Sequence, residues 1–169
     1  DGIILDAVKR IDFTQSSVRQ ILPGFKYELP PKQDKSNITE CDIKTVVDQI
    51  KMRSGKRLSS AVLDAVEGVS PLISREIAAF ACGGDTAVDE LTPIALQRLE
   101  AKLGEIKEML LGEGAEPTML LRDGVKPYDF TFMDITQYGF AVTPKRFGSF
   151  SELLDDFYFE KDRFERTRP

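Results

Sequence analysis

Two predicted helices and the tight turn between them lie in Ala65-Val66-Glu67-Gly68-Val69-Ser70-Pro71-Leu72-Ile73-Ser74-Arg75-Glu76-Ile77. Gly68 tolerates the left-handed backbone that ends a helix, Ser70 is a good N-cap, and Pro71 suits a first helical turn. Before the turn, apolar residues recur at helical spacing from Leu58 to Ala65. After it they recur until Gly83-Gly84, so the stretch predicts one helix ending before Gly68 and another starting at Pro71.

This stretch looks like a helix-hairpin-helix element. A glycine turn lets a phosphate approach the backbone, and the free N–H groups at the start of the second helix, around Ser70 and Leu72, present positive partial charge. The same residues also suit a plain turn between two helices with a good cap. The hairpin therefore predicts either a phosphate contact or a purely structural turn.

Cations precede the hairpin by only about a dozen residues. Four of them have no acid among them, and Arg75 follows on the second helix. A charge run is usually only a solvated helix face, but beside the hairpin it favours local contact with RNA or phosphate. The residues of this predicted nucleic-acid interface are Lys51, Arg53, Lys56, Arg57, Gly68, Ser70, Leu72 and Arg75.

Further helices are expected on either side of the hairpin. Thr39 with Asp42 resembles a capping box before a helical apolar face, which predicts a helix from about 40 to 52. Thr92-Pro93 supplies a cap and a first-turn proline for a helix from about 93 to 111. Its apolar stripe consists of Leu96, Leu99, Leu103, Ile106 and Leu110.

Strand patterns flank the helical region. A β-type run from Ile3 to Val8 precedes proline-rich turns that include Pro30-Pro31, and 118–121 with Asp123-Gly124 and alternating aromatics predicts a hairpin with a type I′ turn. Ser149 with Glu152 then resembles a capping box that opens a last, highly charged helix. The predicted fold class is α+β: a helical helix-hairpin-helix bundle flanked by β segments, with the start of a coiled-coil helix at the C-terminus.

Composition limits the possible functions. The chain has 169 residues, no histidine, two cysteines and a net charge of −5, so the commonest general base and zinc ligand are missing and indiscriminate nucleic-acid binding is disfavoured. We expect Cys41 and Cys82 to be reduced thiols in or near the core. No apolar run approaches the roughly 20 residues that span a bilayer. The first residue is not methionine, and we interpret the chain as an excised fragment.

Two other groups of residues could carry chemistry. The acids Asp155-Asp156 and Asp85, Asp89 and Glu90 lack calcium-loop spacing, so neither a metal site nor acid/base catalysis is expected from them. The aromatics Tyr128, Phe130 and Phe132 could stack bases, but alternation at period two is more typical of a half-buried strand. The sequence therefore predicts no catalytic residues, no metal site, no cofactor and no small-molecule substrate.

Three segments, in the right order, resemble the N-terminal region of the NFACT family, also known as the fibronectin-binding protein A, RqcH and NEMF family. They are Asp1–Lys9 with Arg19–Pro31, whose L-P-G-x-x-Y-x-L-P-P pattern is the most specific; Gly68–Pro71; and Phe147–Tyr158. The resemblance implies three parts. Residues 1–35 end an N-terminal β-rich lobe, 36–115 form a helix-hairpin-helix domain, and 116–169 form a returning β hairpin and the start of a coiled coil.

The resemblance also implies a function. Family members bind large ribosomal subunits obstructed by peptidyl-tRNA and recruit tRNA, so that alanine is added to the stalled peptide. The implied role of this chain is that of a non-catalytic, cytoplasmic module whose partners are the large ribosomal subunit and tRNA. The older family name implies the alternative, a surface-exposed adhesin fragment that binds fibronectin.

Overall fold

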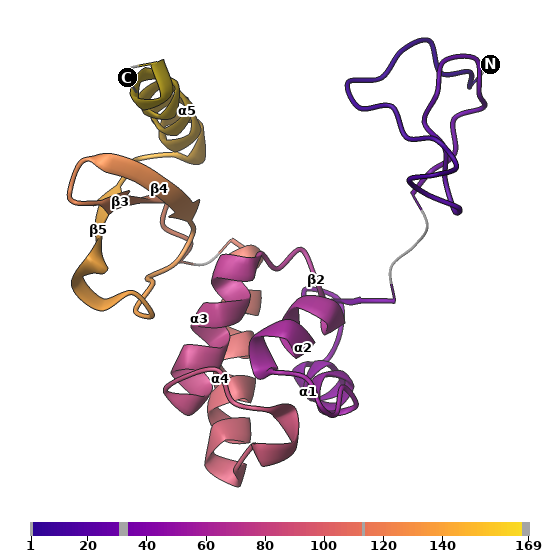
Figure 1. The fold of residues 1–169 in the computed structure, drawn as a ribbon. Coiled ribbons are helices and arrows are strands. Elements are labelled where there is room, and N and C mark those ends of the chain that lie inside the picture. The colour runs from indigo at the N-terminus through magenta and orange to yellow at the C-terminus, as the bar shows by residue number, and fades with distance from the viewer. Residues whose placement is uncertain (1, 31–33, 113, 167–169) are drawn as a thin grey trace. The chain divides into compact units, whose positions relative to one another are not determined.

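The computed structural model describes residues 2–30, 34–112 and 114–166. Contacts divide the chain into two compact units, Asp1–Asp34 and Lys35–Pro169. Helices and small sheets occur together among the described residues, which confirms the predicted α+β class. The helices and sheets, and the contacts between them, belong to the second unit (Figure 1).

The first unit is a loop closed by antiparallel backbone contacts. Ile3 is bridged to Lys26 and Ile11 to Ile21, but within residues 2–30 no bridge extends into a strand. The predicted strand from Ile3 to Val8 is therefore wrong. The physical reason is that this run has no continuous neighbour to pair with, and Leu5 and Val8 stay exposed. Pro31 lies outside the described residues.

Four helices build the main core of the second unit (Figure 1). Their bounds are α1 Ile43–Lys51, α2 Leu58–Ala65, α3 Pro71–Cys82 and α4 Pro93–Leu110, with the short turn η1 Val88–Glu90 before α4. Fully buried side chains from all four meet in one cluster, among them Ile50, Leu58, Ile77, Leu99 and Leu103. The predicted helix starting at Pro71 and the helix over 93–111 are confirmed.

Capping accounts for where these helices begin and end. The hydroxyl oxygens of Ser70 and Thr92 accept hydrogen bonds from the backbone N–H groups three residues on, and Gly83 ends α3 with a left-handed φ of 71°. The capping box predicted at Thr39 is wrong, because its N–H and hydroxyl donate to Asn37 Oδ1 at 3.0 and 2.7 Å. The chain therefore turns over 38–42, and α1 starts only at Ile43.

A short parallel pairing links the hairpin turn to the start of this unit. Strand β1 (Ser36–Asn37) pairs with β2 (Val66–Glu67), which occupies the two residues after α2. Cys41 and Cys82 are unpaired, half-buried thiols packed against the helical core, as predicted.

A three-stranded antiparallel sheet follows the helices. Its order is β4-β3-β5, with bounds β3 Thr118–Arg122, β4 Lys126–Thr131 and β5 Val142–Arg146. Asp123 and Gly124 both have positive φ, and Val125 N–H donates to the Arg122 carbonyl, as in the predicted type I′ turn. Strand β5 was not predicted. It contains Pro144, which an edge strand tolerates.

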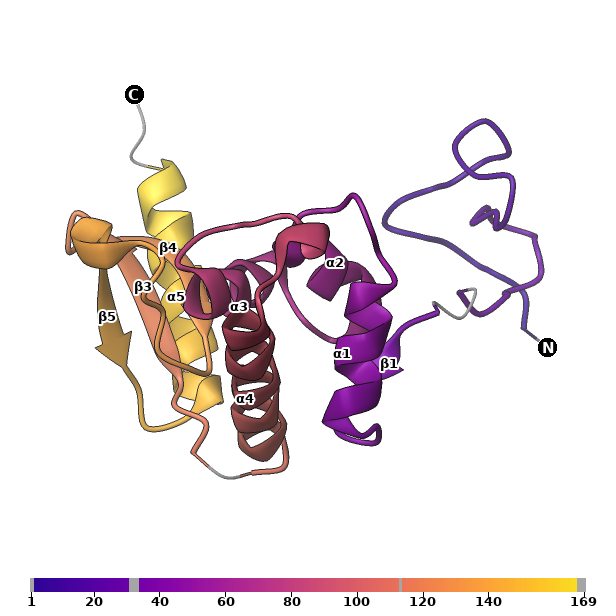
Figure 2. The same cartoon turned by 90° about the horizontal axis from the view of Figure 1, so that it is seen from below.

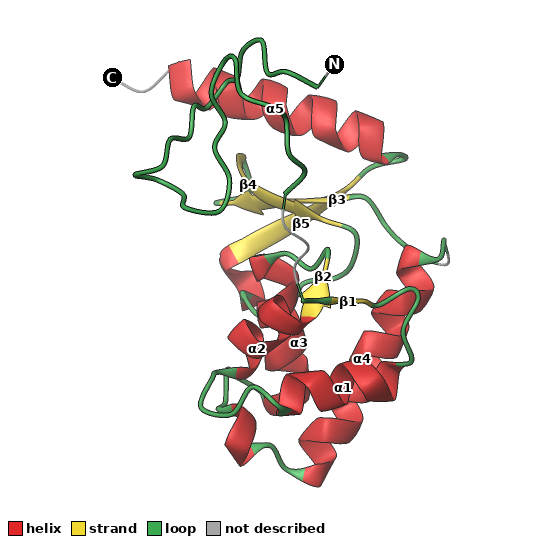
Figure 3. Cartoon of the chain, turned by 90° about the vertical axis from the view of Figure 1, so that its right-hand side faces the viewer, coloured by secondary structure: helices red, strands yellow, loops and turns green. Residues whose placement is uncertain are grey.

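The sheet lies between two helical layers (Figures 2 and 3). On one face, Leu120 and Val142 pack against Leu72 of α3. On the other, Met119 packs against Leu153 and Phe157 of α5 (Phe150–Arg166), whose first turn is capped by Ser149. The two faces of the sheet therefore pack against α3, which precedes the sheet in the sequence, and α5, which follows it.

A β-bulge in β4 separates two aromatic side chains that simple alternation would place on one face. Leu121 pairs with Pro127 and Leu120 with Asp129, so Tyr128 has no partner opposite it in β3. Phe130 packs on Phe157 of α5, whereas the Tyr128 ring meets Tyr138 at 5.6 Å between centroids. Phe130 and Phe132 pack against apolar clusters, as the half-buried strand pattern predicted, whereas Tyr128 is 37% exposed.

A buried carboxylate joins α3 to the segment between β4 and β5. Glu76 is 2% exposed. Its Oε1 accepts from the Thr136 N–H and hydroxyl at 2.9 and 2.6 Å, and its Oε2 accepts from the Gln137 N–H at 3.0 Å. This segment, which leads into the turn η2 (Gly139–Ala141), is thereby held against the helices.

We expect Glu76→Gln to destabilise the chain by roughly 1–3 kcal/mol, because the amide puts N–H groups opposite the N–H of Gln137 and leaves a buried donor unsatisfied. Exposed Glu67→Gln is the matched control, with an expected change within about 0.5 kcal/mol. Urea unfolding measures both variants, and hydrogen exchange should show faster exchange at the Thr136 and Gln137 amides in Glu76→Gln alone. Equal stability of the two variants would contradict a stabilising role for the hydrogen bonds of Glu76 with Thr136 and Gln137, which we call the joint between α3 and the sheet.

Candidate nucleic-acid interface

The hairpin turn presents backbone rather than side chains. Gly68 has φ +77° and is exposed, and Ser70 is exposed at the start of α3. Leu72 is 3% exposed and its side chain packs toward the sheet, so only its backbone could face a ligand. The positive end of the α3 dipole therefore lies at an exposed glycine turn, an arrangement that suits an anion.

Arg53 and Lys56 reach along α2 toward this turn. Arg53 donates to the carbonyls of Gln49 and Asp64, and Lys56 forms an ion pair with the Asp64 carboxylate. The hydrogen bond from Lys56 holds the pKa of Asp64 below its ordinary value, and Arg53 acts in the same direction. Two predicted cations thus meet in the last turn of α2, a few residues before Gly68.

The other predicted cations point elsewhere. Arg57 donates to the Asp85 carbonyl, Lys51 lies 3.8 Å from the carboxylate of Asp48, and Arg75 extends from α3 toward the sheet. The structure therefore brings Arg53 and Lys56 together near the turn, and does not gather all five cations in one patch.

Asp85 and Asp89, which the sequence analysis considered for metal binding or acid/base catalysis, hold the loop that carries Lys56 and Arg57. Asp89 accepts from the Ser54 hydroxyl and the Gly55 N–H, both at 2.6 Å, and these bonds, the Ser54 one above all, lower the pKa of Asp89. Asp85 accepts from the N–H and hydroxyl of Ser59, and so caps α2 from a distant segment. These carboxylates hold the loop in place.

Arg75 lies among residues that the sequence did not single out together. Its guanidinium donates to the Tyr138 hydroxyl at 3.1 Å and lies 3.4 Å from Gln137 Oε1. Tyr138 in turn meets Tyr128, and the Arg122 guanidinium lies 4.3 Å from the centre of the Tyr128 ring. Aromatic alternation pointed to Tyr128, but nothing local in the sequence indicated its neighbours.

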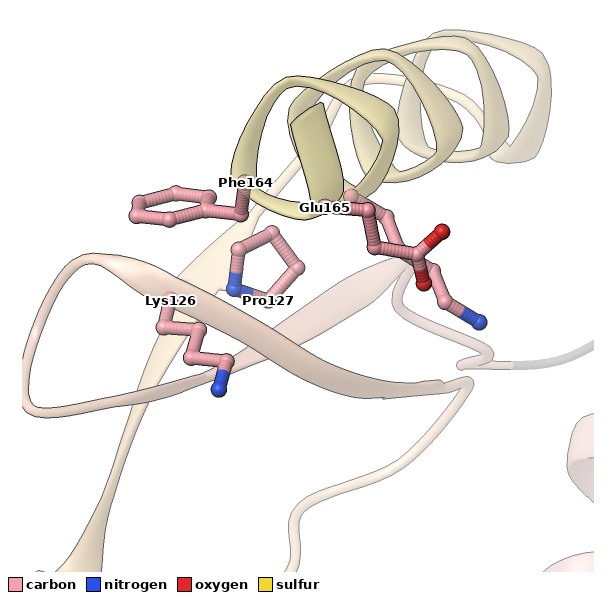
Figure 4. A pocket seen from close by; sticks show the side chains of 5 residues that line it. Lys126, Pro127, Phe164 and Glu165 are labelled. Atoms are coloured by element: carbon pink, nitrogen blue, oxygen red, sulfur yellow. The ribbon is translucent and has the colours of Figure 1, made fainter. Parts of the chain in front are cut away.

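Two of the hollows in the described part of the chain involve α3 or the sheet. One lies between α3 and the joint, lined by Arg75, Ala79, Gly83, Gly84, Asp85, Thr136 and Gln137. The other lies between the start of β4 and the end of α5, where Pro127 faces Phe164 and Glu165 and the Lys126 amine points away (Figure 4). Neither offers a pair of groups arranged for acid/base chemistry.

The described ranges contain neither a cluster of metal-ligating side chains nor a membrane-spanning helix. Over 2–30, 34–112 and 114–166 no three cysteine, aspartate or glutamate side chains gather as metal ligands. In the same ranges, no helix is both long enough and apolar enough to cross a bilayer.

Comparison with known proteins identifies the family. Residues 1–168 match the family model of the NFACT N-terminal and middle domains. The chain belongs to the NFACT family. The resemblance carried by the three sequence segments is thus confirmed.

One relative within the NFACT family is the Rqc2 homolog RqcH of Bacillus subtilis (strain 168), 32% identical over 168 residues. The match covers 99% of this chain and 27% of RqcH. The fold is similar to that of a fibrinogen binding protein from Staphylococcus aureus, with a TM-score of 0.60, 25% identity and coverage of 89% of this chain and 49% of the other.

A second solved structure shares the fold. It is the N-terminal part of a fibronectin/fibrinogen-binding protein from Streptococcus suis, with a TM-score of 0.52 and 19% identity, covering 94% of this chain and 49% of that one. The NFACT chain therefore spans about half the length of these solved structures and about a quarter of RqcH.

The ion pair at Asp64 predicts a pH dependence of stability. Because the pKa of Asp64 is lowered from 3.8 in the folded state, its contribution is complete above 3.8 and is lost as the pH falls below it. The side chains of Lys56 and Asp64 are about half exposed, so we expect Asp64→Asn to cost less than roughly 1 kcal/mol at neutral pH. The difference from wild type should vanish in acid.

Urea unfolding at neutral pH and at several values below 3.8 measures this difference. Asp155→Asn, which removes an exposed carboxylate from α5, controls for the change in net charge. A difference between wild type and Asp64→Asn that stays constant down to the most acidic condition would contradict the ion pair.

Proposed function

We propose that this chain is a non-catalytic module of a cytoplasmic ribosome-associated quality-control factor. In the whole protein it would help to bind large ribosomal subunits obstructed by peptidyl-tRNA, and tRNA, in support of C-terminal alanine tailing. The observation that carries the proposal is the 32% identity to RqcH over 168 residues.

The hairpin region supports an RNA contact physically. A chain with net charge −5 can attract phosphates only where cations gather locally. The head groups of Arg53 and Lys56 reach Asp64 in the last turn of α2, and α3 begins after the next turn. A phosphate beside Gly68 would meet the α3 dipole and the Arg53 guanidinium, and could compete with Asp64 for Lys56.

The lack of catalytic chemistry also supports a module that binds rather than reacts. The sequence has no histidine. Asp85 and Asp89 are occupied by hydrogen bonds to Ser59, Ser54 and Gly55. Such carboxylates are poor candidates for general bases because their lone pairs already accept hydrogen bonds from the protein's own donors.

The second candidate function is adhesion at the cell surface. It is favoured by the similarity to a protein named fibrinogen binding protein. Surface biotinylation of intact cells would label an adhesin and spare a ribosome-bound factor, and co-sedimentation of the full-length protein with large subunits would give the opposite pattern.

A salt series tests the RNA contact at the hairpin. We expect a Lys51→Gln, Lys56→Gln, Arg75→Gln variant of the full-length protein to co-sediment less with large subunits. Its dependence of log affinity on log salt should be flatter by roughly 0.7 to 0.9 per lost phosphate contact. Arg53 and Arg57 are left intact because they donate to backbone carbonyls and support the loop.

The matched control removes three positive charges elsewhere: Lys44→Gln on α1, Arg98→Gln on α4 and Lys161→Gln on α5, all exposed. It should keep the wild-type slope. If both variants lose the same amount, only net charge matters. If neither variant changes in co-sedimentation or salt slope while both remain folded in thermal melts, Lys51, Lys56 and Arg75 belong to a solvated surface that does not contact RNA.

A further inference from the structure

Four side chains form an Arg–Tyr cluster beside the joint between α3 and the sheet: Arg75, Arg122, Tyr128 and Tyr138. The Arg122 guanidinium lies 4.3 Å from the Tyr128 ring centre, and the Tyr128 and Tyr138 rings meet edge to face at 86°. The two hydroxyls lie 3.4 Å apart, and Arg75 Nη2 lies 3.1 Å from that of Tyr138. The cluster is thus one continuous layer of cations and rings.

The cations of the cluster are free to attract an anion. Among the described residues, neither Arg75 nor Arg122 has a carboxylate within ion-pair distance. Both are exposed. Their partners are neutral tyrosines and the amide of Gln137, which leave the positive charge uncompensated. A phosphate could therefore bind without displacing an acid.

The neutral state of Tyr128 is stable at physiological pH. Its hydrogen bond with Tyr138 raises the pKa of Tyr128, and nearby Arg122 and Arg75 act in the opposite direction. Arg122 lies over this ring, and Arg75 is connected to it through the Tyr138 hydroxyl.

The cluster is built by features of the fold that also position the hairpin. The bulge in β4 turns Tyr128 away from α5. Gln137 donates from Nε2 to the Leu72 carbonyl at 2.9 Å, and its Oε1 faces Arg75. The cluster is thus tied to the first turn of α3, next to the exposed backbone at Gly68 and Ser70.

We propose that the Arg–Tyr cluster binds one nucleotide of single-stranded RNA, its base stacked on the outer side of the Arg122 guanidinium and its phosphate on Arg75. Unpaired bases stack on arginine planes as well as on aromatic rings, and Tyr128 beneath Arg122 fixes the plane in advance. The proposal rests on the RNA-binding function proposed above and extends it from the hairpin turn onto the sheet.

The chemistry favours RNA over a peptide. A proline-rich peptide needs an open aromatic groove, but here Arg122 covers one face of Tyr128, which is only 37% exposed, and Tyr138 meets the same ring. Two uncompensated guanidinium groups beside a stacked plane suit a base with its phosphate.

Arginine-to-lysine exchange separates stacking from charge. The assay is fluorescence anisotropy of a labelled single-stranded RNA of about twelve nucleotides with the 169-residue chain across a salt series. Arg122→Lys should weaken binding about 5- to 100-fold without changing the salt slope, because lysine keeps the charge and lacks the plane. Arg75→Ala, which removes the proposed phosphate contact and leaves the stacked plane, should instead flatten the slope by roughly 0.7.

Two controls guard against general effects. Tyr128→Phe keeps the supporting ring and should bind within about threefold of wild type, whereas Tyr128→Ala should bind like Arg122→Lys. Arg98→Ala, which removes an exposed guanidinium from α4, should change affinity little. Circular dichroism melts establish that every variant is folded.

Several outcomes would overturn the inference. They are equal binding by Arg122→Lys and wild type, displacement of the RNA by a proline-rich peptide, and no RNA binding up to about 100 μM protein, the weak end of non-specific affinity. If the oligonucleotide binds as expected but the full-length protein does not co-sediment with large subunits, the nucleotide site is supported and the proposed function is contradicted. If the full-length protein co-sediments but the oligonucleotide does not bind as expected, only the nucleotide site is contradicted.

Discussion

The buried carboxylate of Glu76 is the constraint on which the arrangement of the second unit depends. A charge that is 2% exposed is tolerable only if donors replace its lost water, and Thr136 and Gln137 supply three. All three come from one short segment between β4 and β5, so the sheet cannot move away from α3 without leaving the charge unsatisfied. The apolar contact of Leu72 with Leu120 and Val142 adds a second attachment between α3 and the sheet.

The hydrogen bonds of Glu76 also bring together residues of α3 and of the segment between β4 and β5, which lie far apart in the sequence. Glu76 adjoins Arg75 on α3, and Gln137 adjoins Tyr138 beyond the joint. Fixing Glu76 to Gln137 therefore sets Arg75 against Tyr138, 63 residues further along the chain. The first turns of α3 are held to the segment between β4 and β5 by hydrogen bonds of Thr136 and Gln137 to Glu76 and Leu72.

Sequence reasoning succeeded where the determinants are local. Ser70-Pro71, Thr92-Pro93 and Gly83 fix helix ends through their own backbone preferences, and each acts where it was expected. It failed where a distant partner decides the outcome. The predicted strand from Ile3 to Val8 needed a neighbouring strand, which is absent from residues 2–30. The predicted capping box failed because the Thr39 hydroxyl donates to Asn37 Oδ1 instead. The candidate cations could be named, but their directions depend on acceptors brought close only by folding.

The partners of the cations decide which of them could contribute to the proposed RNA contact. Lys56 and Lys145 lie against carboxylates, which cancel their charge at a distance. Arg53 and Arg57 are instead held by backbone carbonyls, and Arg75 and Arg122 by an amide and tyrosine rings. A neutral acceptor orders a guanidinium without neutralising it, and so reduces the entropy that a phosphate contact would otherwise cost. Arg53 near the hairpin, and Arg75 and Arg122 beside the sheet, are therefore ordered by neutral acceptors. Under the proposed function, a phosphate backbone would be attracted to them despite the net charge of −5.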